Sequence, residues 1–337
     1  MKQFMQGFGL SIAVSLVAFG LVFGFLGTGA GLVALILAMI ELAFSFDNAV
    51  INAKVLTHLN SFWRSLFLSL GIIIAIFGVR ALLPVLIVGL TAHLPLGAVA
   101  DLALHHPSDY ARELLLARPG ITAFGGAFLL VLSLQFFMAE RDVRWLQTIE
   151  EPLGRLRNWW IPMLVALVAV GIVALLPGNH HRSVAFIAGL AGVGLFALMH
   201  GLIALLNKLF AADTGSEQRV GGAALATFIY LEVLDASLSF DGVIGAFAIT
   251  SDVVLIAVGL GVGAIWVRSL TVYMVRNRTL DAYRYLEHGA HYAIFVLALS
   301  MLLAAVVEVP DFVTGATSLG LIAAAIITSR QVIVDKA

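Results

Sequence analysis

Five carboxylates lie inside apolar stretches of the sequence, where a lipid-facing helix would carry none. They occur in two segments, LAMIELAFSFDNAVINA at 37–53 and IYLEVLDASLSFDGVIG at 229–245. The five acids are Glu41, Asp47, Glu232, Asp235 and Asp241. An ionised carboxylate at the centre of a membrane helix costs about 2.5–3.5 kcal/mol on insertion scales, so such residues usually serve a function. These acids are therefore the first candidates for a functional site.

Charge balance indicates what such a site would hold. Two arginines, Arg80 and Arg268, also lie inside apolar segments and can neutralise two of the five acids. Three further buried carboxylates would be too costly unless protons, a cation or both balance them. Hard oxygen ligands suit Mn²⁺, Mg²⁺ or Ca²⁺, and a chain without cysteine offers no thiolate for a soft metal. The predicted ligands are Glu41, Asp47, Asn48, Glu232, Asp235 and Asp241.

Helical spacing limits how these side chains can converge. At about 100° per residue, most of the polar residues form one stripe per helix: Glu41, Ser45 and Asn48 in the first, and Glu232, Asp235 and Ser239 in the second. Asp47 lies about a third of a turn from the first stripe, and Asp241 lies opposite Glu232. Either the Ser-Phe-Asp segments are unwound, or each of these aspartates serves another partner, such as an arginine. Asp47 and Asp241 are thus ligands or gates, and we interpret the two serines as helix-packing residues.

Composition places the chain among polytopic membrane proteins. Of 337 residues, 61% are hydrophobic and only 12% are charged, against about 25% charged residues in soluble domains. The absence of cysteine excludes disulfides and thiol chemistry, and a net charge of −1 argues against a nucleic-acid partner. The sequence has no nucleophile–base motif, zinc-protease motif or phosphate loop, so we do not expect an enzyme and expect no organic cofactor. We interpret the apolar N-terminus as the first span rather than as a signal peptide.

About ten segments are long and apolar enough to cross a bilayer, which needs about 20 residues each. They are 7–26, 30–53, 66–90, 121–139, 159–177, 183–206, 222–249, 252–275, 290–308 and 312–329. With a cytoplasmic N-terminus, 14 lysines and arginines fall on the cytoplasmic side and 3 on the other, leaving Arg80 and Arg268 inside spans. Since positive residues favour the cytoplasm, we expect both termini there.

The connections between these spans suggest a division of the chain. We expect a first half at 1–139, a polar cytoplasmic arm at 140–158 and a second half at 159–337. The loop at 91–120 carries prolines and histidines, and we expect a short surface helix or a re-entrant segment there.

Each half contains one copy of a repeat. Aligning Ser45-Phe46-Asp47 with Ser239-Phe240-Asp241 places Glu41 on Asp235, and the next spans share a glycine followed nine residues later by an arginine. In these next spans Gly71 matches Gly259 and Arg80 matches Arg268. The repeats cover spans 2–4 (about 30–139) and spans 7–9 (about 222–308), whose first members are five crossings apart and therefore run in opposite directions. Inverted repeats of this kind build secondary transporters with a site near the bilayer midplane.

A weaker constellation lies at the predicted cytoplasmic start of span 9. Glu287, His288 and His291 have helical spacing that could hold a metal. A polar helix end is the interpretation that we favour.

The acid–arginine pattern resembles the TerC family of integral membrane proteins. The resemblance rests on Glu-x5-Asp-Asn in span 2, Asp-x5-Asp in span 7 and Gly-x8-Arg in the span after each. It implies export of divalent cations, manganese above all, and an association with tellurium resistance. This chain departs from a symmetric pattern where Gly242 takes the position of Asn48.

The resulting expectation is a divalent-cation exporter, for Mn²⁺ first, in a bacterial inner membrane. Its two repeats would alternate access to the carboxylates, with Arg80 and Arg268 pairing with the aspartates when the ion leaves. Proton antiport would fit, because a carboxylate must lose its proton to bind metal. Two alternatives stay open: an exporter of a small organic cation or amino acid, and a metal-binding sensor or scaffold in metal or tellurium stress that acts through the 140–158 arm. The sequence does not specify the oligomeric state.

Overall fold

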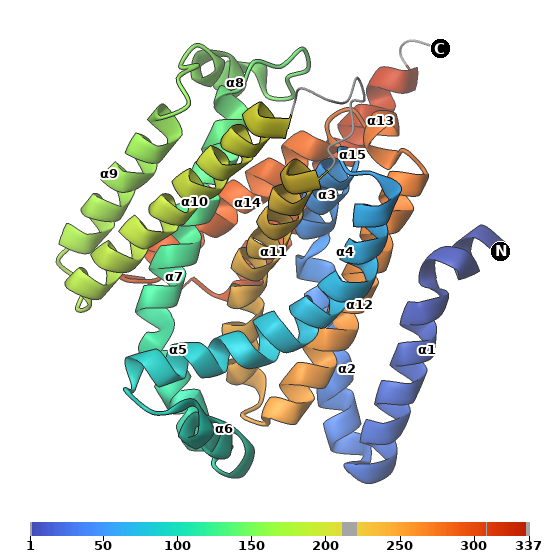
Figure 1. Cartoon of the computed structure of the whole chain (residues 1–337), viewed down its shortest axis with the longest axis vertical. Coiled ribbons are helices and arrows are strands. Elements are labelled where there is room, and N and C mark those ends of the chain that lie inside the picture. The colour runs from blue at the N-terminus through green and yellow to red at the C-terminus, as the bar shows by residue number, and fades with distance from the viewer. Residues whose placement is uncertain (1, 211–220, 308, 335–337) are drawn as a thin grey trace. The chain divides into compact units, whose positions relative to one another are not determined.

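The structure is a computed structural model of the chain, and it describes residues 2–210, 221–307 and 309–334. Every regular element in these ranges is a helix (Figure 1). The all-α membrane architecture expected from composition is therefore observed.

Within the described residues, nine helices are long and apolar enough to cross a membrane. They are Gly7–Phe25, Gly27–Phe44, Ser61–Thr91, Pro107–Met138, Arg182–Leu206, Gly221–Phe247, Val253–Arg276, Leu286–Leu303 and Phe312–Val332. The tenth expected span, 159–177, is the shorter apolar helix α9 (Ile161–Leu175) with 15 residues. At about 1.5 Å per residue it extends roughly 22 Å, less than the hydrocarbon thickness of about 30 Å.

The chain forms two compact units that are each assembled from three stretches. Unit 1 comprises Met1–Ser45, Ser61–Arg118 and Glu232–Tyr273. It contains α1 (Lys2–Phe25), α2 (Gly27–Phe44), α4 (Ser61–Ile73), η1 (Ile74–Leu82), α5 (Leu83–Thr91), α6 (Leu96–His105), the start of α7 (Pro107–Met138), the end of α11 (Gly221–Ile249) and most of α12 (Val253–Arg276). Unit 1 thus contains both arginines together with Glu41, Glu232 and Asp235, whereas Asp47 belongs to unit 2.

Unit 2 comprises Phe46–Asn60, Pro119–Leu231 and Met274–Ala337. It contains α3 (Phe46–Leu56), the rest of α7 and α11, α8 (Gln147–Gly154), α9, α10 (Arg182–Phe210), α13 (Thr279–Ala282), α14 (Leu286–Leu303) and α15 (Asp311–Val334). Helices α9 and α10 pack side by side as a hairpin, and α14 packs on both α15 and α3 (Figure 1). This grouping cuts across the division at residues 139 and 159 that we expected from sequence.

The connection at 91–120, where we expected a short surface helix or a re-entrant segment, is mostly helical. Helix α6 fills its first part, and α7 begins at Pro107 instead of near residue 121. Proline is favourable in the first turn of a helix, where its missing N–H would have no partner, and Asp109 adds a negative charge in that first turn. Pro119 lies inside α7 without ending it. The fourth span is consequently longer than expected.

The two Ser-Phe-Asp segments differ in backbone conformation. Helix α2 ends at Phe44, Ser45 leaves the helical region with φ −100° and ψ 21°, and α3 begins at Phe46. Helix α11, by contrast, continues through residues 239–241 to Ile249, although Gly242 follows directly. The expected unwinding is therefore present in the first repeat and absent from the second.

Candidate functional site

Arg80 is a buried cation that holds the acid of its own repeat. It lies on η1 with 4% of its surface exposed, and its Nη2 donates to the carboxylate of Glu41. The same nitrogen donates to the Ser239 hydroxyl at 3.1 Å, and Nη1 donates to the Ala75 carbonyl at 3.0 Å. The hydroxyl of Ser45 donates to Glu41 at 3.1 Å, so it adds a second hydrogen bond to that carboxylate.

The element that carries Arg80 is a π-helix over Ile74–Leu82. Such wide turns are rare and occur frequently at functional sites. Ala75, whose carbonyl accepts the Arg80 side chain, lies five residues earlier in the same element. The side chain is thus anchored on its own helix while it reaches the acid of α2.

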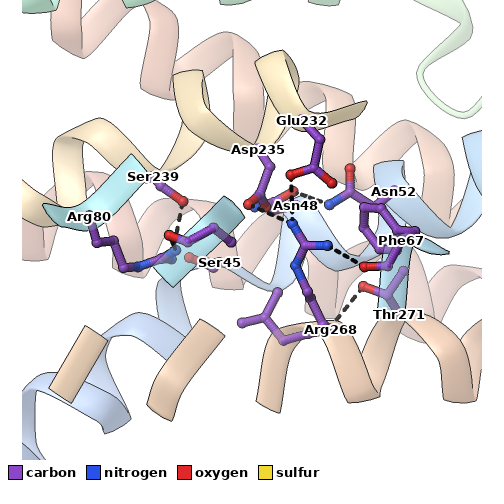
Figure 2. A network of polar contacts seen from close by, with 12 residues as sticks. Ser45, Asn48, Asn52, Phe67, Arg80, Glu232, Asp235, Ser239, Arg268 and Thr271 are labelled. Atoms are coloured by element: carbon purple, nitrogen blue, oxygen red, sulfur yellow. Dashed lines mark hydrogen bonds and ion pairs between the residues drawn. The ribbon is translucent and has the colours of Figure 1, made fainter. Parts of the chain in front are cut away.

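Arg268 occupies the matching position on α12. It is 2% exposed, and Nη2 donates to Glu232 and Asp235 at 3.2 Å each. Nη1 donates to the backbone carbonyl of Phe67 at 2.7 Å, and the guanidinium lies 4.1 Å from the centre of the Phe67 ring. Figure 2 shows this guanidinium facing both acids and the Phe67 carbonyl. The arginine is therefore held by two carboxylates, a carbonyl and an aromatic face.

The two arginine sites correspond to each other in the repeat. The sequence alignment matches Arg80 with Arg268 and Glu41 with Asp235, and the structure pairs each arginine with the acid of its own repeat. Each arginine also contacts the other repeat. Arg80 reaches Ser239 and Arg268 reaches the Phe67 carbonyl. Each site is therefore completed by a residue of the other repeat, and both sites lie within unit 1 (Figure 2).

The glycines of the repeat permit this close approach. A Cβ on Gly71 would lie 2.3 Å from Nη1 of Arg268 and 2.5 Å from Oε1 of Glu232. A Cβ on Gly259, the matching residue, would lie 2.8 Å from the carbonyl of Ala34 on α2. Each glycine thus faces the opposite repeat at a distance that leaves no room for a side chain.

The charges of this arrangement do not cancel. Glu41, Glu232 and Asp235 bring three carboxylates against two guanidinium groups, which leaves one negative charge if all ionise. Oε1 of Glu232 is buried and has no hydrogen-bond partner among the described residues. A proton or a cation would satisfy this oxygen and balance the charge.

The other predicted ligands are placed differently. Asp47 and Asn48 are buried on α3, which belongs to unit 2. Asp47 accepts from the backbone N–H of Asn48 at 2.9 Å, and the Asn48 side chain accepts from Asn52 at 2.6 Å. The side chain of Asp241 lies outside the described part of the structure. In the part that is described, no three His, Asp or Glu side chains gather as a metal site.

The ion pairs described for the two arginines are with the acids predicted as central ligands. The pairing with the aspartates of the Ser-Phe-Asp segments stays a prediction, because the side chain of Asp241 lies outside the described part of the structure. From sequence we interpreted Ser45 and Ser239 as packing residues. In the structure the Ser45 hydroxyl donates to Glu41, and the Ser239 hydroxyl accepts from Arg80. Sequence reasoning missed the Phe67 carbonyl, because a backbone acceptor leaves no signature in the sequence.

Glu287 is the centre of a second ion-pair cluster, in unit 2. It binds Nζ of Lys54 at 2.9 Å and Nη1 of Arg141 at 3.2 Å. Lys54 lies on α3 and Arg141 precedes α8, so one carboxylate on α14 ties both segments together. This is a bridge between cations rather than a free metal ligand.

The neighbouring histidines have other partners. His288 makes a 3.1 Å contact through Nδ1 with Glu150 on α8. His291 directs Nδ1 at the backbone carbonyl of Glu287 at 2.9 Å and stacks on the Phe136 ring at 3.6 Å. Glu287, His288 and His291 therefore have separate partners and do not converge on one point among the described residues.

Glu150 secures the arm that precedes α9. Its carboxylate is 3% exposed and accepts from the backbone N–H groups of Trp145 and Leu146 as well as contacting His288. Burial by itself would raise the pKa of Glu150, but the hydrogen bond and charge of His288 and the two backbone donors hold that pKa below its usual range. Glu150 thus stays ionised at neutral pH and keeps the arm attached to α14.

A family model described as "Protein of unknown function (DUF475)" matches residues 46–335, most of the chain. The matched region begins at the first residue of α3 and includes both buried arginines. No curated protein and no solved structure matches significantly.

Proposed function

This chain belongs to the DUF475 family of proteins of unknown function, and we propose that it transports a divalent cation, Mn²⁺ first, across a membrane. The observation that carries this proposal is the pair of buried arginine–carboxylate sites at matching positions of two repeats. Inverted repeats with buried carboxylates near the midplane are a transporter plan. The resemblance to TerC proteins in the same residues supports the same cation class and outward transport.

In this mechanism the guanidinium groups take the place of the transported ion. While no cation is bound, Arg80 and Arg268 neutralise Glu41, Glu232 and Asp235. An arriving divalent cation competes for these oxygens and releases the arginines, so its charge replaces theirs. Because each arginine also contacts the opposite repeat, its release loosens one repeat from the other. Ion binding would thereby be coupled to alternating access.

A proton can balance the negative charge that remains at the site before the metal binds. One negative charge stays uncompensated in the arrangement described, and a carboxylate must lose its proton before it ligates a metal. We assign this proton to Oε1 of Glu232, which has no hydrogen-bond partner among the described residues. The entering metal would then expel this proton, so that metal binding is coupled to proton release, as in an antiporter.

Transport into inside-out membrane vesicles tests the proposal. We expect the natural chain to accumulate Mn²⁺, and Glu41→Gln and Asp235→Asn to reduce the rate at least about tenfold, since each loses a charged ligand. Asp101→Asn on the exposed surface of α6 is the matched control and should transport normally.

Three results would contradict different parts of the proposal. Normal Mn²⁺ uptake by both acid variants would reject the site while keeping the activity. Saturable Mn²⁺ binding by the natural chain without any uptake would reject transport and favour a sensor. Uptake of an organic cation that Mn²⁺ does not inhibit would indicate the organic-cation exporter.

A further inference from the structure

Unit 2 contains a cavity of about 500 Å³ that the transport mechanism does not use. It is lined by residues of α3, α7, α10 and α14, some polar and some apolar. The polar lining residues are Lys54, His58, Gln135, Arg141, His200, Tyr230, Glu287 and His291. The apolar lining residues include Leu132, Ile203 and Ala204. A cavity with both kinds of lining residue fits an amphipathic ligand.

The charged lining residues of the cavity have a net positive charge. Lys54 and Arg141 face a single carboxylate, that of Glu287, which they share. A lysine ammonium carries three N–H donors and an arginine guanidinium five, more than one carboxylate can accept. Lys54 and Arg141 are also 43% and 30% exposed, so an incoming ligand can reach them. The cavity therefore favours an anion with several acceptor oxygens.

An aromatic residue indicates the depth of the cavity in the membrane. His200 lines the cavity, and its ring lies parallel to that of Trp159 with centroids 6.0 Å apart. Trp159 and the adjacent Trp160 are 61% and 47% exposed. Exposed tryptophans of membrane proteins gather at the headgroup level. The cavity consequently lies where lipid phosphates are found.

The side of the membrane follows from the basic residues. Lys54 and Arg141 belong to the set of 14 that we place in the cytoplasm. The cytoplasmic leaflet is rich in anionic lipids, and basic pockets between membrane helices on that side bind their headgroups.

We propose that this cavity binds the phosphate headgroup of an anionic phospholipid. Lys54 and Arg141 donate to the phosphate oxygens in place of Glu287, and an acyl chain contacts apolar lining residues such as Leu132 and Ile203. Glu287 is the internal competitor of the phosphate, because it holds the same two cations in this structure. The site is in unit 2 and does not depend on the transport activity proposed for unit 1.

The test is a titration of the purified full-length chain in detergent, followed through its thermal unfolding temperature. The probes are a short-chain phosphatidylglycerol, a phosphatidylcholine of the same chain length and inorganic phosphate. We expect phosphatidylglycerol to stabilise the chain at concentrations where the other two do not. Lys54→Gln and Arg141→Gln should each weaken its apparent affinity about fivefold, the usual contribution of one basic residue near a membrane surface.

Three further variants separate binding from folding. Glu287→Gln removes the competitor and should strengthen the affinity for phosphatidylglycerol. Ala204→Phe places a larger side chain in the cavity without changing a charge and should weaken that affinity. Arg155→Gln is the matched control, an exposed arginine whose ion pair is with Glu151, and should bind normally.

Equal stabilisation by phosphatidylglycerol and phosphatidylcholine would overturn the proposal. The proposal would also be overturned if Glu287→Gln and Ala204→Phe both kept the affinity of the natural chain for phosphatidylglycerol. This test holds even if the Lys54 and Arg141 variants do not fold. Stabilisation by inorganic phosphate equal to that by phosphatidylglycerol would assign the site to a soluble anion and overturn the lipid.

Discussion

Arg80 and Arg268 are buried cations that require a carboxylate each. Removing one partner of a buried ion pair leaves an uncompensated charge in a region of low dielectric constant, and this usually costs more than the pair itself contributes. Arg80 and Glu41 have only 2% and 3% of their side chains exposed, so solvent cannot compensate the remaining charge. The stability of the site and the ion exchange that we propose for it therefore depend on the same contacts.

Glu41→Gln should destabilise the chain by about 3–5 kcal/mol, because it leaves Arg80 charged and buried. The double variant Glu41→Gln/Arg80→Gln should recover part of this loss, since it removes both charges. Chemical unfolding in detergent of Glu41→Gln, Arg80→Gln and the double variant measures the coupling energy between the two side chains. Strictly additive effects would show that the two side chains do not form an energetically significant pair.

Close helix approach in unit 1 depends on glycine. Gly263, one helical turn after Gly259 on α12, lies against Glu41 itself. A Cβ there would be 2.6 Å from Cβ of Glu41 and 2.9 Å from the backbone carbonyl of Ala38. Because a backbone carbonyl cannot rotate away, α12 or α2 would have to move.

Gly263→Ala should therefore destabilise the chain by about 1–3 kcal/mol through overpacking. Gly20→Ala on α1 is the matched control, because a Cβ there meets nothing within 4 Å, and alanine has the higher helix propensity. Thermal unfolding of both variants in the same detergent gives the comparison. Equal stability of the two would mean that α2 and α12 are not in the contact described.

The topology of the whole molecule depends on whether α9 crosses the membrane. The helix is only 15 residues long, yet the expected asymmetry of 14 against 3 basic residues favours a crossing between the arm and Arg182. A short helix can cross if the bilayer thins or flanking residues adapt, at a modest cost. Exposed Trp159 and Trp160, just before α9, are suited to anchor one end at the interface.

Labelling of single introduced cysteines tests whether α9 crosses the membrane, because the natural chain has no cysteine that would react. We expect Arg155→Cys to react with an impermeant thiol reagent only from the cytoplasmic side. His106→Cys and His181→Cys should react only from the opposite side. Labelling of positions 155 and 181 from the same side would place α9 on the membrane surface and reverse the expected orientation of every later span.

Much of the helical content could be predicted because it depends on local composition. Apolar segments of about 20 residues have few alternatives to a membrane helix, since each backbone polar group must be satisfied within the segment. Nine of the ten expected windows accordingly have long apolar helices among the described residues. The expected start of the fourth span at residue 121 was wrong, because α7 begins at Pro107 and the charged residues in its first turns lower the hydropathy there.

The sequence by itself determined that acids and arginines recur in the same order in two apolar repeats, since that order is written in the residues. Only the tertiary structure decided that Arg80 holds Glu41 while Arg268 holds Glu232 and Asp235, and that the helix breaks at Ser45 but continues past Ser239. The physical reason is that these choices are made by contacts distant in sequence. The Phe67 carbonyl and the Ser239 hydroxyl complete the arginine sites from the opposite repeat, and no local pattern records such partners.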